Sequence, residues 1–391
     1  MDSKICDGKL YIYLKGRISS ENSSDMEKEA EAIINKNPNM ETVIDVNELI
    51  YISSAGLRVL LRLKKEIKGD VIIVNASPEI YDIFEVTGFS DIFDVKKKLR
   101  NISIDGCEII GEGAVGTVYR IDEDTIVKVY KEGISMEEIN RENEMAKKAF
   151  LMGIPTAISY DVVTVGNSYG TVFEMIKADN YNELIRENPE DKERIVREYA
   201  MFLKKIHSVD MTGTILPDMR DIFVSFINEI GDILPKDLSD KLIRLIKDMP
   251  SCMRVVHGDV QMKNVMYDGK EPLLIDMDSL SVGNPVFELQ GLYISYKLYE
   301  EDEEGNTFKF LGITKEMADY IYDKTMEYYF EGKSEDEKRD AEIKIRIVAY
   351  IRFLHLVAVR NIGLPSLKDI RVEHTISHLY ENLMKVTNLQ I

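Results

Sequence analysis

Three residues in the second half of the chain carry the side chains that phosphoryl transfer requires. Asp259 ends the run His-Gly-Asp at 257–259, Asn264 follows on the same predicted loop, and Asp276 follows the apolar stretch 272–275. Phosphoryl transfer needs one carboxylate beside the attacking hydroxyl and oxygen ligands that hold Mg²⁺ on the nucleotide phosphates. This set of residues meets both needs. The alternative is structural, with two aspartates in the turns of a hairpin and an asparagine that caps a helix.

A glycine-rich segment lies well before these residues. Gly111, Gly113 and Gly116 belong to the run Gly-Glu-Gly-Ala-Val-Gly-Thr-Val at 111–118. The same glycine spacing also marks dinucleotide-binding folds, in which the third glycine opens a helix. Here the chain continues as a strand after Gly116, so the segment joins two strands and its backbone N–H groups can cover phosphates. A hairpin bulge that contains glycine is the alternative.

A lysine and a glutamate downstream of the glycine segment are predicted to pair. Lys128 lies in the strand-like run 126–130, where it shares a face with neither of the flanking valines. Glu142 lies in the next predicted helix, near apolar residues three, four and seven positions later. A glutamate on a buried face needs a cation, and Lys128 is the natural partner. Glu144 is the competing choice, but lysines follow it at the same spacings.

All of these residues lie in the second of two regions whose patterns differ. Residues 1–100 alternate short strands with helices, which predicts an α/β domain. Residues 105–178 are rich in strands and contain one predicted helix, 136–151. Residues 179–391 are mostly helical. We therefore predict an α/β domain followed by an α+β domain with a β-rich small lobe and a helical large lobe.

The second region resembles the aminoglycoside phosphotransferase and choline kinase branch of the protein-kinase-like fold. The matching features are the glycine segment, Lys128, Glu142, the His-Gly-Asp loop with Asn264, and Asp276. The run Leu-Lys-Lys-Ile-His at 203–207 is similar to that family's helix ahead of the catalytic loop. Glycine after the histidine, instead of the arginine of eukaryotic-type protein kinases, favours the small-molecule branch.

The resemblance implies a role for each matched residue. Asp259 would orient the acceptor hydroxyl and accept its proton. Asn264 and Asp276 would ligate Mg²⁺. Lys128 would hold the α- and β-phosphates, and Glu142 would hold Lys128.

The resemblance also implies a nucleotide-binding hinge. The run Glu-Met-Ile at 174–176 matches it, so the Glu174 carbonyl and the Ile176 N–H would bind the adenine. Backbone recognition leaves no side-chain signature, so ATP and GTP both stay open as the nucleotide. The glycine segment is closer to the protein-kinase pattern than in many antibiotic kinases, which keeps protein substrates open.

The first region resembles the STAS domain of anti-sigma factor antagonists, through the run Tyr-Ile-Ser-Ser-Ala-Gly-Leu at 51–57. In that family a serine at the start of a helix is phosphorylated to switch partner binding, and Ser54 matches it by position. A helix N-terminus tolerates an added phosphate, because it offers free N–H groups and a positive dipole end. The alternative is that Ser53 or Ser54 is only the N-cap. Many regulated members have Asp where this chain has Ser53.

The composition limits the classes of partner and compartment. The chain has 391 residues, with 69 acidic and 50 basic ones and a formal charge of −19, which argues against nucleic acid as a partner. Three scattered cysteines predict neither a disulfide framework nor a zinc site. No apolar run approaches the ~18 residues that span a membrane, and the first residues are polar where a signal peptide is apolar. We expect a cytoplasmic protein with no membrane partner.

An acidic run and two histidines have structural interpretations. In antibiotic kinases, acidic residues of the helical lobe bind amino groups of the substrate, and the run 300–304 has that character. A solvated loop is nevertheless the favoured interpretation. His207 and His257 are interpreted as structural, and His257 as a hydrogen-bonding brace of the catalytic loop.

Three functional hypotheses follow. The first is an ATP- and Mg²⁺-dependent phosphotransferase that acts on a hydroxyl of a small polar acceptor, such as an amino sugar or amino alcohol. Its STAS module would regulate it or recruit a protein partner. The second is a serine protein kinase whose substrate is a STAS domain, through its own Ser54 or that of a partner. The third is a partner-switching scaffold whose kinase-like lobe only senses nucleotide.

Overall fold

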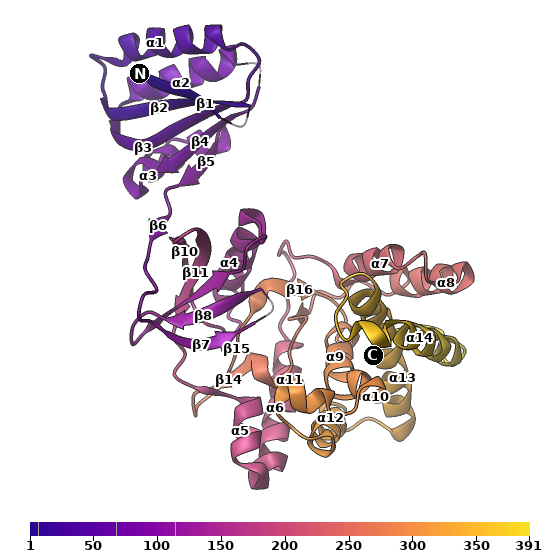
Figure 1. Cartoon of the computed structure of the whole chain (residues 1–391). Helices are drawn as coiled ribbons and strands as arrows, with labels where there is room; N and C mark the ends of the chain where they lie inside the picture. The colour runs from indigo at the N-terminus through magenta and orange to yellow at the C-terminus, as the bar shows by residue number, and fades with distance from the viewer. Residues whose placement is uncertain (7, 68, 114) are drawn as a thin grey trace. The chain divides into compact units, whose positions relative to one another are not determined.

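The computed structural model describes residues 1–6, 8–67, 69–113 and 115–391. The chain divides into two compact units (Figure 1). Residues 1–103 and 163–167 form the first unit, and residues 104–162 and 168–391 form the second. Each unit has its own cluster of buried apolar side chains. The fold is an α/β domain followed by a domain with a β-rich and a helical part, as the sequence patterns predicted.

The first unit is built on a five-stranded sheet in the order β1-β2-β3-β4-β5. β1 pairs with β2 antiparallel, and the other neighbours are parallel. Parallel neighbours need crossover connections, which the helices α1, α2 and α3 supply in turn. The strands are β1 (Asp2–Cys6), β2 (Lys9–Ile18), β3 (Thr42–Ile52), β4 (Val71–Ala76) and β5 (Asp94–Lys97). The helices are α1 (Ser23–Lys36), α2 (Ser54–Glu66) and α3 (Pro78–Val86), and a short strand β6 (Arg100–Asn101) pairs with Val163 and Thr164.

Ser53 and Ser54, at the start of α2, occupy different positions of the helix. Ser53 is the N-cap, and its side chain accepts a hydrogen bond from the N–H of Gly56 at 3.3 Å. Ser54 is the first helical residue and is exposed. Residue 56 must be small, because a Cβ there would lie 2.6 Å from Cγ2 of Ile18 and 2.8 Å from Cγ1 of Ile52. The glycine therefore lets α2 approach the ends of β2 and β3.

The β-rich part of the second unit contains the strands β10-β11-β9-β8-β7 side by side. The pairs β11–β9, β9–β8 and β8–β7 are antiparallel. Helix α4 packs against β11 and against the turn Met277–Ser279. The elements are β7 (Glu108–Glu112), β8 (Gly116–Arg120), β9 (Thr125–Tyr130), α4 (Met136–Leu151), β10 (Ser159–Val165) and β11 (Ser168–Glu174).

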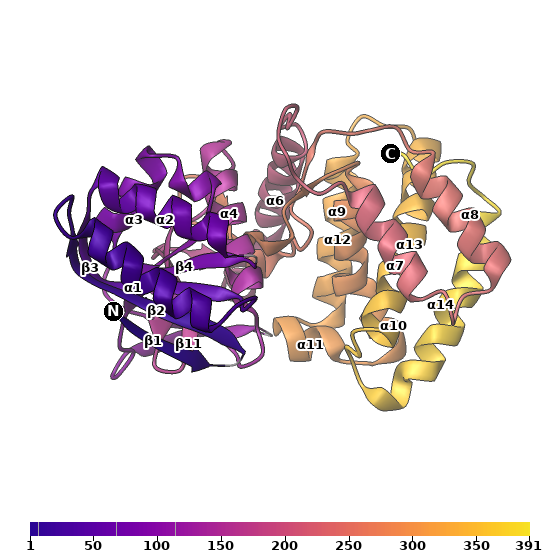
Figure 2. The same ribbon diagram turned by 90° about the horizontal axis from the view of Figure 1, so that it is seen from above.

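The rest of the second unit is mostly helical, and Figure 2 shows α7, α9, α12, α13 and α14 gathered in one helical lobe. Two small sheets interrupt it, β12-β14-β15 and β13-β16. Among the described residues, no helix combines the length and apolar character needed to cross a membrane. The helices are α5 (Tyr181–Glu187), α6 (Lys192–Ile206), α7 (Met219–Glu229), α8 (Lys236–Lys247), α9 (Val286–Tyr293), α10 (Tyr299–Asp302), α11 (Asn306–Leu311), α12 (Lys315–Tyr329), α13 (Glu335–Ala358) and α14 (Lys368–Leu383). The strands are β12 (Asp179–Asn180), β13 (Val255–Val256), β14 (Val265–Tyr267), β15 (Pro272–Leu274) and β16 (Ser281–Val282).

Replacement of Gly56 tests the close approach of α2 to the sheet. Gly56→Ala forces the branched side chains of Ile18 and Ile52 to move, so we expect the first unit to lose about 1–3 kcal/mol of stability. Hydrogen exchange of the β2 and β3 amides in the full chain measures the loss. Gly291→Ala is the control, because a Cβ there meets nothing within 4 Å inside helix α9. Unchanged exchange in Gly56→Ala would contradict the packing argument.

Candidate active site

Lys128 links two carboxylates that come from distant parts of the second unit. Its Nζ lies 2.7 Å from Oε1 of Glu142 and 2.8 Å from Oδ1 of Asp276. Lys128 lies on β9, Glu142 on α4, and Asp276 two residues after the end of β15. The predicted pairing of Lys128 with Glu142 is confirmed, and the competing Glu144 is exposed on the same helix. The sequence did not predict the second contact, between Lys128 and Asp276.

The charges of this cluster compensate one another. Burial opposes the charge on Lys128, but Asp276 and Glu142 outweigh it, and the pKa of Lys128 is raised. Burial likewise opposes the charge on Asp276, although 42% of its side chain is exposed, and the contact with Lys128 lowers the pKa of Asp276. Burial dominates at Glu142 and raises its pKa. At Asp278, burial and then the neighbouring Asp276 charge raise the pKa. Asp276 is therefore the better ionised group of the Asp-Met-Asp run.

Asp259 is held by two amide side chains of its own loop. Nδ2 of Asn264 donates to the backbone oxygen of Asp259 at 2.8 Å and to its Oδ2 at 2.9 Å. Nε2 of Gln261 donates to Oδ1 at 2.9 Å. Tyr199 also donates from its hydroxyl to the Val260 carbonyl at 2.7 Å. Because both carboxylate oxygens accept hydrogen bonds, the orientation of the Asp259 side chain is fixed.

The hairpin β14–β15 brings Asn264 close to Asp276. Val265 pairs with Leu274 across the hairpin, and the N–H of Ile275 donates to the Asn264 carbonyl at 3.1 Å. Asn264 therefore lies opposite the residue that precedes Asp276. Asp276 itself has a left-handed backbone, with φ of 66°. Such a conformation is uncommon outside glycine and costs energy, which fits a side chain held by its surroundings.

The His-Gly-Asp loop is anchored by a glutamate that the sequence analysis missed. Glu288 on α9 is 1% exposed, and its carboxylate accepts the backbone N–H groups of His257 and Gly258 at 2.5 and 3.0 Å. Gly258 has φ of 92°, and a Cβ there would lie 2.8 Å from Cβ of Ser279. This position therefore favours glycine over the larger residue found in protein kinases. A single acid in the apolar run 286–293 was the signal that could have identified Glu288.

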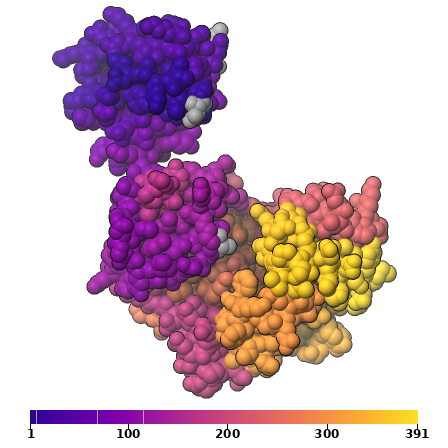
Figure 3. Space-filling model, viewed as in Figure 1, coloured from indigo at the N-terminus to yellow at the C-terminus, as the bar shows by residue number. Residues whose placement is uncertain are grey.

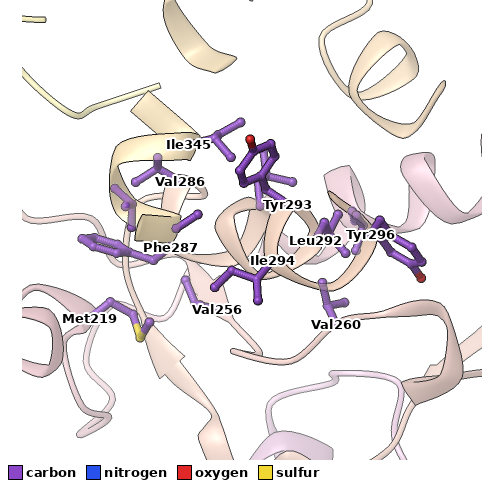
Figure 4. Packing of buried hydrophobic residues seen from close by; sticks show 14 of the residues in the cluster. Met219, Val256, Val260, Val286, Phe287, Leu292, Tyr293, Ile294, Tyr296 and Ile345 are labelled. Carbon is purple, nitrogen blue, oxygen red and sulfur yellow. The ribbon is translucent and has the colours of Figure 1, made fainter. Parts of the chain in front are cut away.

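His257 braces the loop, as predicted. Its Nε2 lies 3.0 Å from the Ile275 carbonyl, and the N–H of Asp259 points to its Nδ1 at 3.3 Å. This network assigns the proton to Nε2. His257 therefore ties the His-Gly-Asp loop to the strand end that carries Asp276. Figure 4 shows Val256 and Val260, which flank the loop, among the apolar side chains of α9 and the π-helical segment Ile294–Leu298.

The three glycines of the segment 111–118 differ in their surroundings. A Cβ at Gly116 would lie 2.5 Å from the carbonyl oxygen of Val129, so the packing of β8 on β9 requires glycine there. At Gly111 and Gly113 a Cβ would meet only ordinary contacts, at 3.7 Å or more. The folded chain therefore does not require glycine at these two positions. Ala114 of the same segment lies outside the described residues.

The predicted hinge lies at the end of β11. The N–H of Glu174 donates to the Ile158 carbonyl at 2.9 Å, and the N–H of Met175 donates to the Asp124 carbonyl at 2.8 Å. Ile176 follows directly and is half-buried. The Glu174 side chain accepts from the N–H of Ile158 at 3.3 Å. These contacts fix the strand end in which the two predicted backbone groups lie.

The acidic run 300–304 is not a solvated loop, so that expectation was wrong. Partners within the chain bind the carboxylates of Glu300, Glu301, Asp302 and Glu303. Glu300 is buried and accepts from the backbone N–H groups of Gly305 and Thr307. Glu303 binds the buried Arg371 at 2.9 Å. Figure 3 shows the orange surface of this region adjoining the yellow surface of the C-terminal helices. The run stabilises the helical lobe because its charges hold turns and neighbouring helices.

Both units are similar to known protein families. A model of the phosphotransferase enzyme family matches residues 106–308, and a model of the STAS domain matches residues 1–102. Over 92 residues the chain is 37% identical to BtrV of Bordetella bronchiseptica, whose name places it among anti-sigma factor antagonists. That match covers 23% of this chain and 78% of BtrV.

Two solved structures are among those similar to this chain. A choline/ethanolamine kinase family protein from Mesorhizobium loti is 14% identical, with a TM-score of 0.45, and the match covers 72% of this chain and 89% of that chain. The ADP-bound aminoglycoside phosphotransferase APH(2'')-Ib is 17% identical, with a TM-score of 0.48, and the match covers 77% and 98% of the two chains.

Replacement of Glu288 tests the anchor of the loop. Burial opposes the charge of Glu288, but His207, His257 and the backbone N–H donors outweigh it, and the pKa of Glu288 is lowered. Glu288→Gln keeps one accepting oxygen but puts an N–H₂ group against the other of the two backbone N–H donors and removes the negative charge, so we expect a loss of about 2–4 kcal/mol in urea unfolding at neutral pH.

The pH dependence has a definite sign. The stabilisation by ionised Glu288 is present above the unfolded pKa of about 4.3 and is lost as pH falls through the lowered folded value. The difference between wild type and Glu288→Gln should therefore shrink in acid. Glu144→Gln, at an exposed position of α4, is the control and should leave the midpoint unchanged. Equal stability of wild type and Glu288→Gln at neutral pH would contradict the anchor.

Proposed function

The chain belongs to the phosphotransferase enzyme family and carries an N-terminal STAS domain, and from this premise we propose that it is a Mg²⁺-dependent kinase. It transfers the γ-phosphoryl group of ATP or GTP to a hydroxyl of a small polar acceptor, of the aminoglycoside or choline kind. The STAS domain regulates this activity or binds a protein partner. One observation carries the proposal: a single lysine contacts Glu142 of the small lobe and Asp276 beside the catalytic loop.

In this proposal Asp259 is the catalytic residue. It orients the acceptor hydroxyl and accepts its proton as the phosphoryl group leaves the nucleotide. The hydrogen bonds from Asn264 and Gln261 support this role, because they fix the carboxylate before the acceptor arrives. Little covalent chemistry is required of the protein, since positioning and electrostatic stabilisation supply most of the rate.

The residues proposed for the metal fit Mg²⁺. Asp276 offers a partly exposed carboxylate, and Asn264 donates through Nδ2, which leaves its Oδ1 as the available ligand atom. Mg²⁺ takes one or two protein oxygens and completes its shell with water and phosphate oxygens. Bound Mg²⁺ would neutralise charge on the phosphates.

The small lobe supplies the proposed nucleotide contacts. Lys128 holds the α- and β-phosphates, and Glu142 keeps it in place. Gly111 and Gly113 keep side chains away from the phosphates, and a Cβ at either position would meet only ordinary contacts in the folded chain. The N–H of Gly113 itself donates to the Gly116 carbonyl at 2.8 Å. The Glu174 carbonyl and the Ile176 N–H bind the base. Gly116 contributes through the pairing of β8 with β9 instead.

A second candidate function is a serine protein kinase that phosphorylates a STAS domain. The observation in its favour is that the two serines at the start of α2 have different structural positions. Ser53 provides the cap, so the exposed hydroxyl of Ser54 is not needed for that task. A phosphate on Ser54 would meet the positive end of the helix.

The variant Asp259→Asn tests the proposed base. We expect turnover of ATP or GTP with a responsive acceptor to fall by about 10²–10⁴-fold, because the amide cannot accept the proton. Nucleotide affinity, measured by calorimetry, should change little. Asp268→Asn is the control, since Asp268 is exposed in the turn after β14. Undiminished turnover in Asp259→Asn would contradict the assignment.

Incubation of the full chain with γ-labelled ATP tests the second candidate. Label that is lost in Ser54→Ala but retained in Ser53→Ala would support it, although Ser53→Ala should cost about 1 kcal/mol as a lost cap. An unlabelled chain that consumes nucleotide with aminoglycosides, choline-like alcohols or sugars supports the small-molecule kinase. Nucleotide binding without label or turnover supports the scaffold hypothesis instead.

A further inference from the structure

Two buried hydroxyl groups lie behind the Lys128–Glu142 pair. The Tyr130 hydroxyl donates to Oε2 of Glu142 at 3.0 Å, and it lies 2.9 Å from Oγ1 of Thr171. Tyr130 is 4% exposed and Thr171 is fully buried. Lys128 uses the other oxygen of the same carboxylate, Oε1. Each oxygen of Glu142 therefore has its own donor.

The sheet places these groups on one face. Tyr130 follows Lys128 by two residues on β9, so their side chains point to the same side. Thr171 on β11 pairs directly with Lys128 in the antiparallel register, so it shares that side. Glu142 reaches the group from α4, which packs on β11.

The hydrogen bonds have one consistent direction. A carboxylate that accepts from a lysine has no proton to give, so the single phenolic proton of Tyr130 points to Glu142. The Tyr130 oxygen is then left as an acceptor, and Thr171 must be the donor to it. The chain of contacts runs from Thr171 through Tyr130 and Glu142 to Lys128. Each buried polar group in this chain has a partner, which keeps the arrangement rigid.

We propose that Tyr130 and Thr171 are positioning residues that set the place of the Lys128 ammonium by holding the far oxygen of Glu142. This inference rests on the proposed function, because the place of Lys128 matters through its contact with nucleotide phosphates. Without the hydroxyl of Tyr130, Lys128 is the one remaining hydrogen-bond partner of the Glu142 carboxylate among the described residues, and Glu142 can turn away from the sheet. Lys128 then also samples other positions, and the nucleotide must select the competent one.

Removal of single hydroxyls tests this role with little change in shape. Tyr130→Phe keeps the ring that packs 5.7 Å from Nζ of Lys128, and Thr171→Val is nearly isosteric. We expect each to weaken binding of a fluorescent ATP analogue to the full chain by about 3- to 10-fold, on the scale of one buried hydrogen bond. The effect should fall on the nucleotide KM and Kd, with kcat for the bound nucleotide much less affected. Thr171→Ser keeps the donor and should restore wild-type affinity.

A double-mutant cycle separates positioning from a general loss of stability. If Tyr130 acts through Glu142, Tyr130→Phe should have little further effect on affinity in a Glu142→Gln background. A purely structural role would instead lower the unfolding midpoint and leave affinity unchanged in both backgrounds. Tyr169→Phe is the matched control, because Tyr169 lies on β11 with its side chain exposed.

The outcomes distinguish this inference from the proposed function. A wild-type chain that binds nucleotide, with Tyr130→Phe and Thr171→Val binding equally well, overturns the inference alone. Additive effects of Tyr130→Phe and Glu142→Gln also overturn it. A wild-type chain that binds neither ATP nor GTP overturns the proposed function, and the inference with it.

Discussion

The second unit depends on one electrostatic constraint: the half-buried ammonium of Lys128 must be neutralised, and it is neutralised by acids from both lobes. Burial of most of the Lys128 side chain opposes its charge, so Glu142 and Asp276 must stay within reach of it. Removal of one partner of a buried pair leaves an uncompensated charge, which costs far more than the pair gains. The positions of α4 and of the strand end at Asp276 are therefore coupled through a single nitrogen atom.

The catalytic loop follows the same principle with backbone groups in place of charges. The N–H groups of His257 and Gly258 point into a buried region, where each needs an acceptor. The Glu288 carboxylate supplies both oxygens to them, and the apolar face of α9 holds that carboxylate in place. Asp259 then projects from a loop whose path is already fixed. The loop thus gains its rigidity from a residue about thirty positions later in the chain.

The sequence allowed prediction of those parts of the site that follow from local spacing. Lys128 and Glu142 could be paired from strand and helix periodicity, and the structure confirms that pair. Glu288 and Tyr130 could not be identified in this way, because their partners are set by tertiary packing and not by spacing. Gln261 lies only two residues from Asp259, but an irregular loop has no periodicity from which that contact could be predicted. For the acidic run at 300–304, the sequence led to a wrong prediction. Composition suggested solvent exposure, whereas Glu300 closes a turn and Glu303 neutralises a buried arginine.

The sequence pattern alone could not decide which of the two serines at the start of α2 is the N-cap. A helix start needs one side-chain acceptor for its free N–H groups, and either serine satisfies the pattern. Geometry decides between them, since only Ser53 has the extended backbone of an N-cap and accepts the N–H of Gly56. The next residue is thereby released from a structural task while it stays at the positive end of the helix. A charged group on the Ser54 hydroxyl would therefore leave the cap intact, because the cap hydrogen bond belongs to Ser53.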